Sequence, residues 1–397
     1  MKILYHHRTA SKDGQAVHIE EMIAALRAQG CEVIVVEPPA LSAADFGRTA
    51  AHANALRRWI PKPLAEMLEL SYTLVAYRRL RRAVEQHRPD VLYERHNLYL
   101  LAGRWIKRRY GLPYLLEVNA PLALERHQHD GLAFPRLARR LEASVWRSAD
   151  IVLPVSAVLG RIIEAEGVDP RRIVVIPNGI NLEAFGATVP SDEAKRRLGL
   201  AGRVVLGFTG FVRPWHGLEQ VIDFIAETRR ADLFLLVVGD GPARSALAAH
   251  AERRGVAGQV RFTGVVSRAA VPAMVAAFDV ALQPAATPYA SPLKLFEYLA
   301  LGRAIVAPNQ PNLAEILEDG KNGLLFDPAQ PGDLARALSR LVNDAALRER
   351  LGRAARETIL LKGLTWRQNA QRVIALAEQL RRKRIAASEA SAPPRVA

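Results

Sequence analysis

The chain has 397 residues, half of them hydrophobic, and a formal net charge of +15 at pH 7. This length exceeds what one hydrophobic core usually supports, so we expect two domains. The single cysteine, Cys31, excludes an internal disulfide framework and a cysteine-rich zinc cluster, and it agrees with a reducing compartment. The sequence shows neither the apolar segment of a signal peptide nor an apolar run of the roughly 18 residues that span a membrane, so we expect a cytoplasmic protein.

Positive charge is concentrated in one part of the chain. Residues 48–147 hold 19 Lys and Arg against 9 Asp and Glu, with basic runs at 78–82 and 107–109. Together with the segment Trp-Ile-Pro-Lys-Pro at 59–63, these runs could face the anionic headgroups on the inner face of a membrane. The alternative is an ordinary solvated surface that is rich in arginine. We do not expect nucleic acid as a partner.

The first half of the chain alternates short apolar strands with helical patterns, the first helix beginning near Gly14. This alternation is typical of a parallel sheet that is covered by helices on both faces. The loop before Gly14 lacks the pattern G-x-G-x-x-G, which argues against dinucleotide binding of the NAD type. Strands are expected at 2–6, 31–37, 90–94, 113–119, 151–155 and 172–176.

Polar side chains follow two of these strands. Functional groups in parallel sheets collect at the carboxyl ends of strands, so we expect these residues to serve function rather than to fill the core. One set follows the strand at 90–94 and the other the strand at 113–119, and together they are Glu94, Arg95, His96, Glu117, Asn119, Glu125 and Arg126.

The segment 155–185 is expected to close the first domain. Ser156 is placed to cap a helix that Gly167 ends, and Pro177-Asn178-Gly179 forces a turn after a strand. A linker of about 186–200 then leads to a second domain.

The second domain opens with a buried strand at 203–210, followed by Phe-Val-Arg-Pro-Trp-His-Gly. Arg213 in this loop is a permanent cation whose donors suit phosphate oxygens, with an ordinary surface arginine as the alternative. Further strands are expected at 233–242, with Gly239 and Gly241 in the turn, and at 260–267.

The stretch SPLKLFEYLALGRAIVA begins at Ser291, which we expect to cap a helix. The free N–H groups of the first turn, together with Lys294, suit a diphosphate. Glu297 lies one turn further on and could accept the two hydroxyls of a ribose, while Gly302 ends the helix before a buried strand. The alternative is an amphipathic helix with a surface Lys–Glu pair.

These motifs, and the order in which they follow along the chain, resemble those of glycosyltransferase family 4, the retaining nucleotide-sugar transferases of the GT-B fold. The resemblance implies an α/β protein of two Rossmann-like domains with a cleft between them and a last helix that crosses back to the first domain. The implied parts are an acceptor domain at 1–185, a linker at 186–200, a nucleotide-sugar domain at 201–365, the crossing helix at 366–385 and a disordered tail at 386–397.

The resemblance also implies roles for particular residues. Catalysis would fall to Arg213, Lys294, Asn119 and Glu117. The donor nucleotide sugar would contact Gly14, Arg213, His216, Gly239, Gly241, Val266, Ser291, Lys294 and Glu297. The acceptor side would comprise Glu94, Arg95, His96, Glu125 and Arg126.

Some positions depart from the usual family pattern. Tyr289 stands where the family has a second glutamate near the donor sugar, and Asn119 where a histidine is common. Phe211 and His216 occupy the usual arginine and lysine positions of the phosphate loop. The departure at Tyr289 leaves the sugar open, and the nucleotide base stays open because backbone amides of the loop at 260–267 would recognise it.

The implied reaction transfers a sugar to a glycan or lipid-linked acceptor with retention at the anomeric carbon. The sequence has no Asp-x-Asp motif, so we expect neither a metal nor another cofactor besides the nucleotide sugar. Two alternatives are a nucleotide-sugar epimerase of the same fold and a non-catalytic protein that binds membranes or polymers.

Overall fold

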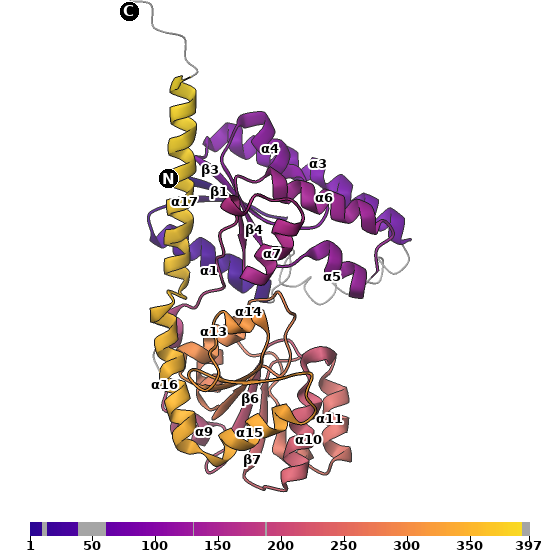
Figure 1. Ribbon diagram of the computed structural model, residues 1–397, viewed down its shortest axis with the longest axis vertical. Coiled ribbons are helices and arrows are strands. Elements are labelled where there is room, and N and C mark those ends of the chain that lie inside the picture. The colour runs from indigo at the N-terminus through magenta and orange to yellow at the C-terminus, as the bar shows by residue number, and fades with distance from the viewer. Residues whose placement is uncertain (10–13, 39–60, 130, 187–188, 391–397) are drawn as a thin grey trace, which may run out of the picture. The chain divides into compact units, whose positions relative to one another are not determined.

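The computed structural model describes the chain except for residues 10–13, 39–60, 130, 187–188 and 391–397. It forms two compact units: Met1–Pro177 with Asn369–Ala397, and Asn178–Gln368 (Figure 1). The chain thus leaves the first unit at Pro177, earlier than the position 185 that the sequence suggested. The segment 186–200, expected as a linker, belongs instead to the second unit.

Two short helices explain this difference. Helix α8 (Leu182–Gly186) places Phe185 in the core of the second unit. Helix α9 (Ser191–Arg197) buries Ala194 against Ala276 and Ala277 of the same unit. Their apolar side chains therefore hold this segment against the second unit.

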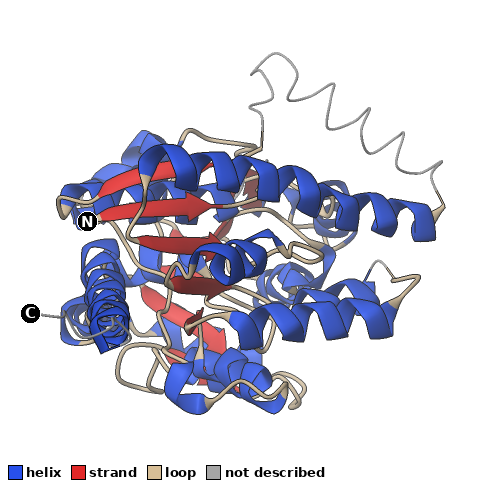
Figure 2. Cartoon of the chain, turned by 90° about the horizontal axis from the view of Figure 1, so that it is seen from above, coloured by secondary structure: helices blue, strands red, loops and turns tan. Residues whose placement is uncertain are grey.

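The sheet of the first unit is parallel and has the order β2-β1-β3-β4-β5 (Figure 2). The expected strand at 172–176 is instead an extended segment beside β5, joined by one bridge between Val152 and Ile173 and by a 2.9 Å bond from the Val174 N–H to the Val152 carbonyl. The strands are β1 (Lys2–His6), β2 (Glu32–Val36), β3 (Val91–Arg95), β4 (Tyr114–Val118) and β5 (Ile151–Pro154).

Helices cover both faces of this sheet, as its continuously buried strands predict (Figure 2). Ser156 caps α7 as expected, accepting the N–H of Leu159 at 3.1 Å. The helices are α1 (Gly14–Ala28), α3 (Lys62–His87), α4 (Ala102–Tyr110), α5 (Leu122–His129), α6 (Pro135–Ser148) and α7 (Ala157–Ala165).

The last helix, α17 (Trp366–Ala390), lies mostly within the first unit. It buries Ala370, Val373 and Ala377 there, and the Asn369 amide donates to the carbonyl of Pro177 at 2.7 Å. It continues past 385, where the sequence suggested that a disordered tail begins. No helix within the described ranges combines the length and apolarity of a membrane span.

The sheet of the second unit is also parallel, with the order β11-β10-β9-β6-β7-β8. The sequence had suggested no strand at β9, which has only three residues and lies between β6 and β10. The strands are β6 (Val204–Thr209), β7 (Leu233–Val238), β8 (Val260–Phe262), β9 (Val280–Leu282), β10 (Ala304–Pro308) and β11 (Leu324–Phe326).

Two apolar clusters cover the faces of this second sheet. One joins the sheet to α10, α11 and α15, and the other joins it to α13 and α16. Gly207 in β6 leaves room for the Phe278 ring, because a Cβ at this position would overlap it. The helices are α10 (Leu218–Thr228), α11 (Arg244–Arg253), α12 (Val271–Ala276), α13 (Leu293–Ala300), α14 (Pro311–Ala314), α15 (Asp333–Asn343) and α16 (Ala345–Leu361).

Candidate functional site

The start of α13 is the centre of the candidate site in the second unit. The expectation that Ser291 caps this helix is wrong. Its hydroxyl accepts the backbone N–H of Asn178 at 3.2 Å, its carbonyl accepts the Asn178 side-chain amide at 2.5 Å, and Pro292 occupies the cap position without a side-chain hydrogen bond. Ser291 therefore fixes the turn at Asn178, and the residue in the cap position, Pro292, gives the first-turn N–H groups of α13 no side-chain hydrogen bond.

Lys294 in the first turn of α13 lies against the end of β6. Its Nζ atom is 3.7 Å from the centroid of the Phe208 ring, and a Cβ at Gly210 would lie 3.4 Å from its Cε atom. Burial lowers the pKa of Lys294 to about 7, although the charge of Glu297 opposes this shift. A cation that is held by an aromatic face and backbone can still bind an anion.

Glu297 lies one turn after Lys294 on the same helix. Burial raises the pKa of Glu297 to about 7, against the opposing charges of Lys294 and Arg268. The next residue, Tyr298, is fully buried and anchors the helix, because its hydroxyl accepts the N–H of Thr209 at 2.9 Å. The helix therefore holds a carboxylate and an ammonium whose pKa values are both near neutrality, a pattern that is enriched at functional sites.

Residues of the loop after β6 lie beside this helix. His216 is buried, its Nδ1 atom accepts the N–H of Arg213 at 3.1 Å, and its ring centroid lies 5.0 Å from that of Phe208. Burial, followed by the charges of Lys294 and Arg213, lowers the pKa of His216 to about 3. His216 is therefore neutral and orients the loop, while the exposed Arg213 guanidinium lies 5.1 Å from the centroid of the Phe211 ring.

Gly239 and Gly241 have a packing role in this site. A Cβ on Gly239 would overlap the carbonyl oxygen of Gly210, and one on Gly241 would overlap that of Val212. The Val212 N–H donates to the carbonyl of Asp240 at 2.9 Å. These glycines therefore let the loops after β6 and β7 lie backbone to backbone.

The loop after β8 joins the same group of loops. Thr263 Oγ1 accepts the N–H of Gly239 at 3.2 Å, and a bridge links Gly239 to Gly264. Val266 packs its side chain against the apolar core of the second unit. Val266 therefore offers a ligand its backbone rather than its side chain.

Sequence reasoning missed one residue that shapes this edge. The Asn312 side-chain amide donates to the carbonyls of Thr287 and Ala290, at 3.1 and 2.7 Å, and so fixes the loop that leads to α13. Tyr289, at the position of the second family glutamate, is buried in the same loop. The only signal in the sequence was an asparagine just after a proline that begins a short helix.

In the first unit, the predicted polar residues divide into separate groups, and the largest surrounds Glu117. This buried carboxylate bonds to Arg95, to the Asn119 amide at 2.5 Å and to the Tyr93 hydroxyl at 2.7 Å, and it lies 2.9 Å from His18 Nε2. Burial alone would raise the pKa of Glu117, but the charges of His18 and Arg95 outweigh it and hold the pKa well below its usual range. Glu117 is therefore an ionised anchor for Arg95 and Asn119.

Glu94 does not join this group. It accepts from His6 Nδ1 at 2.6 Å and the Tyr114 hydroxyl at 2.5 Å, and a Cβ on Gly103 of α4 would overlap its carboxylate. Its neighbour Arg95 points to the other face of the sheet, because successive side chains of a strand alternate. Glu94 is only 1% exposed, so it lies in the core and not at the expected acceptor side.

The remaining predicted residues of the first unit are dispersed. His96 Nε2 lies 3.1 Å from Glu142 Oε1. Arg126 pairs with Glu69 on α3 at 2.6 Å, and Glu125 stands beside it on α5. Gly14 begins α1, while the loop residues 10–13 before it lie outside the described part of the chain. Within the described ranges, no group of three or more His, Cys, Asp or Glu residues is placed to hold a metal ion.

Comparison with known proteins shows two family matches. Residues 12–184 match the family described as Glycosyltransferase Family 4, and residues 191–358 match the family described as Glycosyl transferases group 1. Together these matches cover most of both units.

Two curated relatives are similar in sequence. The chain is 28% identical to D-inositol 3-phosphate glycosyltransferase of Nocardioides sp. over 399 residues, which covers 92% of this chain and 85% of the relative. It is 29% identical to 2-deoxystreptamine glucosyltransferase of Streptomyces kanamyceticus over 261 residues, covering 62% of this chain. That match spans 66% of the relative's length.

Solved structures share the fold. The crystal structure of Anabaena HepE in complex with UDP-glucose matches with a TM-score of 0.72 at 20% identity, covering 96% of this chain and 100% of that one. Sucrose-phosphate synthase from Thermosynechococcus elongatus matches with a TM-score of 0.77 at 18% identity, covering 96% and 99%. The two parallel-sheet units thus have the GT-B fold.

Proposed function

Because the chain belongs to glycosyltransferase family 4, we propose that it transfers a sugar from a nucleoside diphosphate sugar to a glycan or lipid-linked acceptor, without a metal and with retention at the anomeric carbon. The observation that carries the proposal is the start of α13. There, first-turn N–H groups without a side-chain cap, the cation Lys294 and the carboxylate Glu297 lie on one helix of eight residues.

Each of these groups has a part in holding the donor. The N–H groups and Lys294 would bind the diphosphate, since a helix N-terminus and a cation both favour negative charge. Glu297 would accept the ribose hydroxyls. Anabaena HepE has been crystallised with UDP and with UDP-glucose, which makes UDP-sugars the first candidates for this chain.

Lys294 and Arg213 would also supply the catalytic charge. When the glycosidic bond to the diphosphate breaks, negative charge grows on the leaving phosphate, and fixed cations stabilise that charge. Retention would follow if the acceptor attacks from the side that the diphosphate leaves, its proton passing to a phosphate oxygen. In this proposal no protein carboxylate acts as the base.

The acceptor would contact the group around Glu117. The Glu117 carboxylate is ionised and surrounded by donors, so it has the character of a positioning residue rather than a general base. Arg95 and Asn119, which it holds, would present the remaining guanidinium and amide groups to acceptor hydroxyls. The variant Asn119→Ala should therefore raise the KM for the acceptor more than that for the donor.

A panel of nucleotide sugars tests the proposal. Thermal unfolding with UDP-, GDP- and ADP-sugars should show stabilisation by one base class, since a ligand at 100 times its Kd adds about 2.7 kcal/mol. The control is Glu297→Ala, which should lose the shift. Release of the nucleoside diphosphate only with an added acceptor supports a transferase, whereas conversion of the donor sugar alone would indicate an epimerase.

We also propose that the first unit rests on an anionic membrane surface, and helix α3 supports this. Leu64, Met67 and Leu68 each leave half or more of their surface exposed, and the same face of the helix continues to Arg78 and Arg82. An exposed apolar half followed by a basic half suits a lipid interface. Trp59 and Ile60, which the sequence placed in this surface, lie outside the described residues.

Liposome sedimentation tests this second proposal. The chain should sediment with phosphatidylglycerol vesicles and not with phosphatidylcholine vesicles, and the binding should fall at high salt, because each basic residue near the surface adds about 1 kcal/mol that salt screens. The double variant Leu64→Ser with Leu68→Ser should bind the vesicles less. The control Leu361→Ser, at an exposed leucine in the second unit, should bind them as the wild type does. Equal binding to both lipids would refute the proposal.

A further inference from the structure

A cavity in the second unit lies at the opposite end of α13 from Lys294. Its volume is about 750 Å³, and its walls are the start of α9, the turn after α13 and one face of α16. Two of its lining residues show where it lies, because Asp279 directly precedes β9 and Arg303 directly precedes β10. The cavity thus lies at the amino edge of the sheet, away from the proposed donor site.

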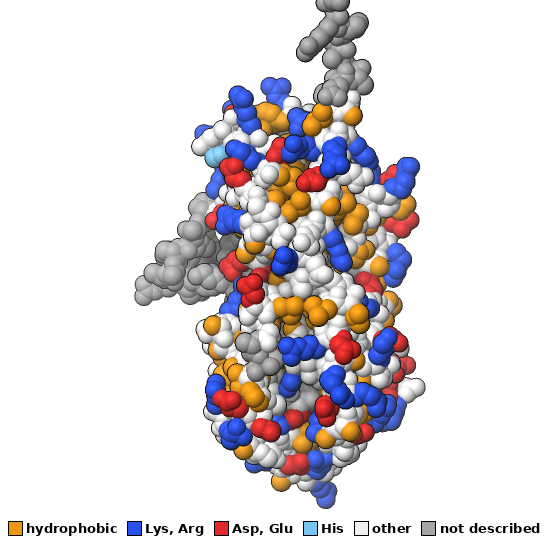
Figure 3. Space-filling model, turned by 90° about the vertical axis from the view of Figure 1, so that its left-hand side faces the viewer, with side chains coloured by type: hydrophobic (Ala, Val, Ile, Leu, Met, Phe, Trp, Pro, Cys, Tyr) orange, Lys and Arg blue, Asp and Glu red, His pale blue; other side chains and the backbone are white. Residues whose placement is uncertain are grey.

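Four arginines line this cavity: Arg303, Arg348, Arg353 and Arg356. Figure 3 views the molecule from the side on which α16 lies, and Lys and Arg side chains lie among acidic ones on this face of the second unit. Arg353 and Arg356 form no ion pair with any residue in the described ranges, and both are exposed. Their charges are therefore available to a ligand.

Close backbone packing brings α16 to this position. A Cβ on Gly352 would overlap the carbonyl oxygen of Gly302, and one on Gly302 would lie 3.8 Å from the Cβ of Arg356. Glycine at both positions thus lets α16 approach the turn that carries Arg303. This close packing therefore brings the arginines of the helix near that of the turn.

Arg303 is oriented by backbone carbonyls. Its Nε atom donates to Leu301 at 2.8 Å, and its Nη1 atom donates to Ala276 and Phe278 at 3.0 and 3.1 Å, which leaves Nη2 for a ligand. Burial lowers the pKa of the Arg303 guanidinium; the carboxylate of Asp279 opposes this shift and the charge of Arg356 adds to it. The fold therefore places two like charges close enough to repel each other.

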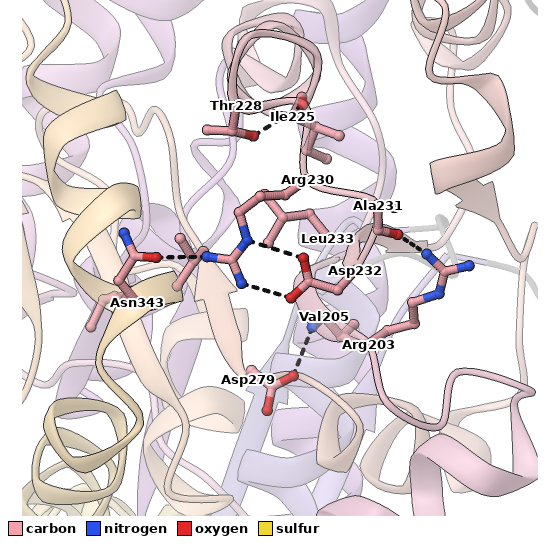
Figure 4. Close-up of polar contacts among 12 residues, drawn as sticks. Arg203, Val205, Ile225, Thr228, Arg230, Ala231, Asp232, Leu233, Asp279 and Asn343 are labelled. Atoms are coloured by element: carbon pink, nitrogen blue, oxygen red, sulfur yellow. Dashed lines mark hydrogen bonds and ion pairs between the residues drawn. The ribbon is translucent and has the colours of Figure 1, made fainter.

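The carboxylates of the cavity do not cancel this charge. Asp279 is engaged by Lys195 at 2.6 Å and by the N–H of Val205 at 2.7 Å, the latter drawn in Figure 4. Asp192 and Glu349 remain, against four arginines. Arg230, another arginine at this edge of the sheet, differs from Arg353 and Arg356 because side chains already bind it: Figure 4 shows it bonded to Asp232 and to Asn343.

We propose that this cavity binds a small molecule carrying a phosphate group, with Arg353 and Arg356 on the phosphate and Arg303 on a neighbouring oxygen. Guanidinium groups bind phosphate oxygens through paired hydrogen bonds, and a bound anion would relieve the repulsion between the arginines. The volume lies in the range of small-molecule sites and exceeds what a lone phosphate ion fills. This site is separate from the proposed donor site and does not depend on the proposed function.

Calorimetric titration with glucose 1-phosphate tests the proposal, with glucose as the uncharged control ligand. The wild-type chain should bind glucose 1-phosphate and not glucose. Arg353→Ala with Arg356→Ala should weaken binding at least tenfold, and Arg353→Lys with Arg356→Lys, which keeps the charge, should weaken it less. Melting temperatures near the wild-type value would show that these variants, altered only at exposed side chains, remain folded.

Two matched variants locate the binding. Arg350→Ala removes another exposed arginine of α16 that does not line the cavity, and it should bind as the wild type does. Lys294→Ala, which alters the donor site, should also leave this binding unchanged. The proposal is overturned if the wild type does not bind, if both paired arginine variants bind like the wild type, if Arg350→Ala loses as much affinity, or if only Lys294→Ala weakens the binding.

Discussion

The ammonium nitrogen of Lys294 lies 3.7 Å from the centre of the Phe208 ring, so the first turn of α13 is in contact with the end of strand β6. An aromatic face attracts a cation without neutralising it, unlike a carboxylate. Lys294 is thus fixed in place while its charge remains available to an incoming diphosphate. Burial at this position lowers the pKa of Lys294 to about 7.

Proton uptake should accompany nucleotide binding above neutral pH. With a pKa near 7, much of Lys294 is neutral at pH 8, and a bound diphosphate favours the charged form and raises the pKa. Calorimetry of the nucleotide at pH 8 in buffers of different ionisation enthalpy should show this uptake, and Lys294→Met should abolish it. If the proton uptake is unchanged in Lys294→Met, the titrating group lies elsewhere. His216 cannot account for the uptake, because with a pKa of about 3 it is already neutral at pH 8.

The same pKa shift predicts how stability changes with pH in the free protein. The folded-state pKa of Lys294 lies below its ordinary value of 10.5, so between about pH 7 and 10.5 the unfolded chain binds more protons and this residue makes stability rise with pH. Lys294→Met should therefore stabilise the free protein more at pH 7 than at pH 10. Urea unfolding at the two pH values measures this, and a pH-independent difference would contradict the shift.

Glu297→Ala should raise the donor KM or abolish turnover while the protein stays folded, because the ribose hydroxyls lose their acceptor. The control is Glu318→Ala, which removes an exposed carboxylate of the second unit whose one ion pair within the described residues is with exposed Lys321. Initial rates over a range of donor concentrations, with melting curves for both variants, give the answer. Unchanged donor kinetics in Glu297→Ala would remove this residue from the site.

Arg213→Ala and Lys294→Ala should each lower kcat by about 10²-fold or more, since both are proposed to stabilise charge that develops as the diphosphate leaves. EDTA should leave the activity intact. Steady-state kinetics separates the outcomes: an effect on donor KM alone would mean that these cations bind the donor without assisting its departure. A requirement for a divalent metal would contradict the leaving-group proposal.

Gly207→Ala should destabilise the protein by about 1–3 kcal/mol, because its methyl group would overlap the Phe278 ring in the core below the site. Gly258→Ala is the matched control, since a Cβ there meets nothing within 4 Å. Denaturant unfolding of both variants compares them. Equal stability of the two would show that the core adjusts to the added methyl group at no cost.

Much of the fold could be predicted from the sequence because each parallel strand is a short apolar run bounded by turn residues. Strand β9 was missed because three apolar residues after a helical segment carry no periodicity of their own. The segment 186–200 was misread because Pro and Ser suggested a linker, whereas Phe185 and Ala194 pack into the second unit.

The candidate site was predictable in part. Lys294 and Glu297 lie on one helix, as their spacing required, but Ser291 bonds to Asn178, a residue 113 positions away, which no local pattern reveals. Similarly, Glu94 and Glu117 both lie next to the last residue of a parallel strand. Only the alternation of side chains across the sheet places Glu94 in the core and Glu117 in the group with Arg95.

The most direct measurement is a crystal structure with the nucleoside diphosphate that the thermal panel selects. The ribose hydroxyls should lie within hydrogen-bond distance of the Glu297 carboxylate, and the diphosphate should contact Lys294 and the first-turn N–H groups of α13. A nucleotide that binds elsewhere, with Lys294 and Glu297 untouched, would contradict the assignment of this helix as the donor site.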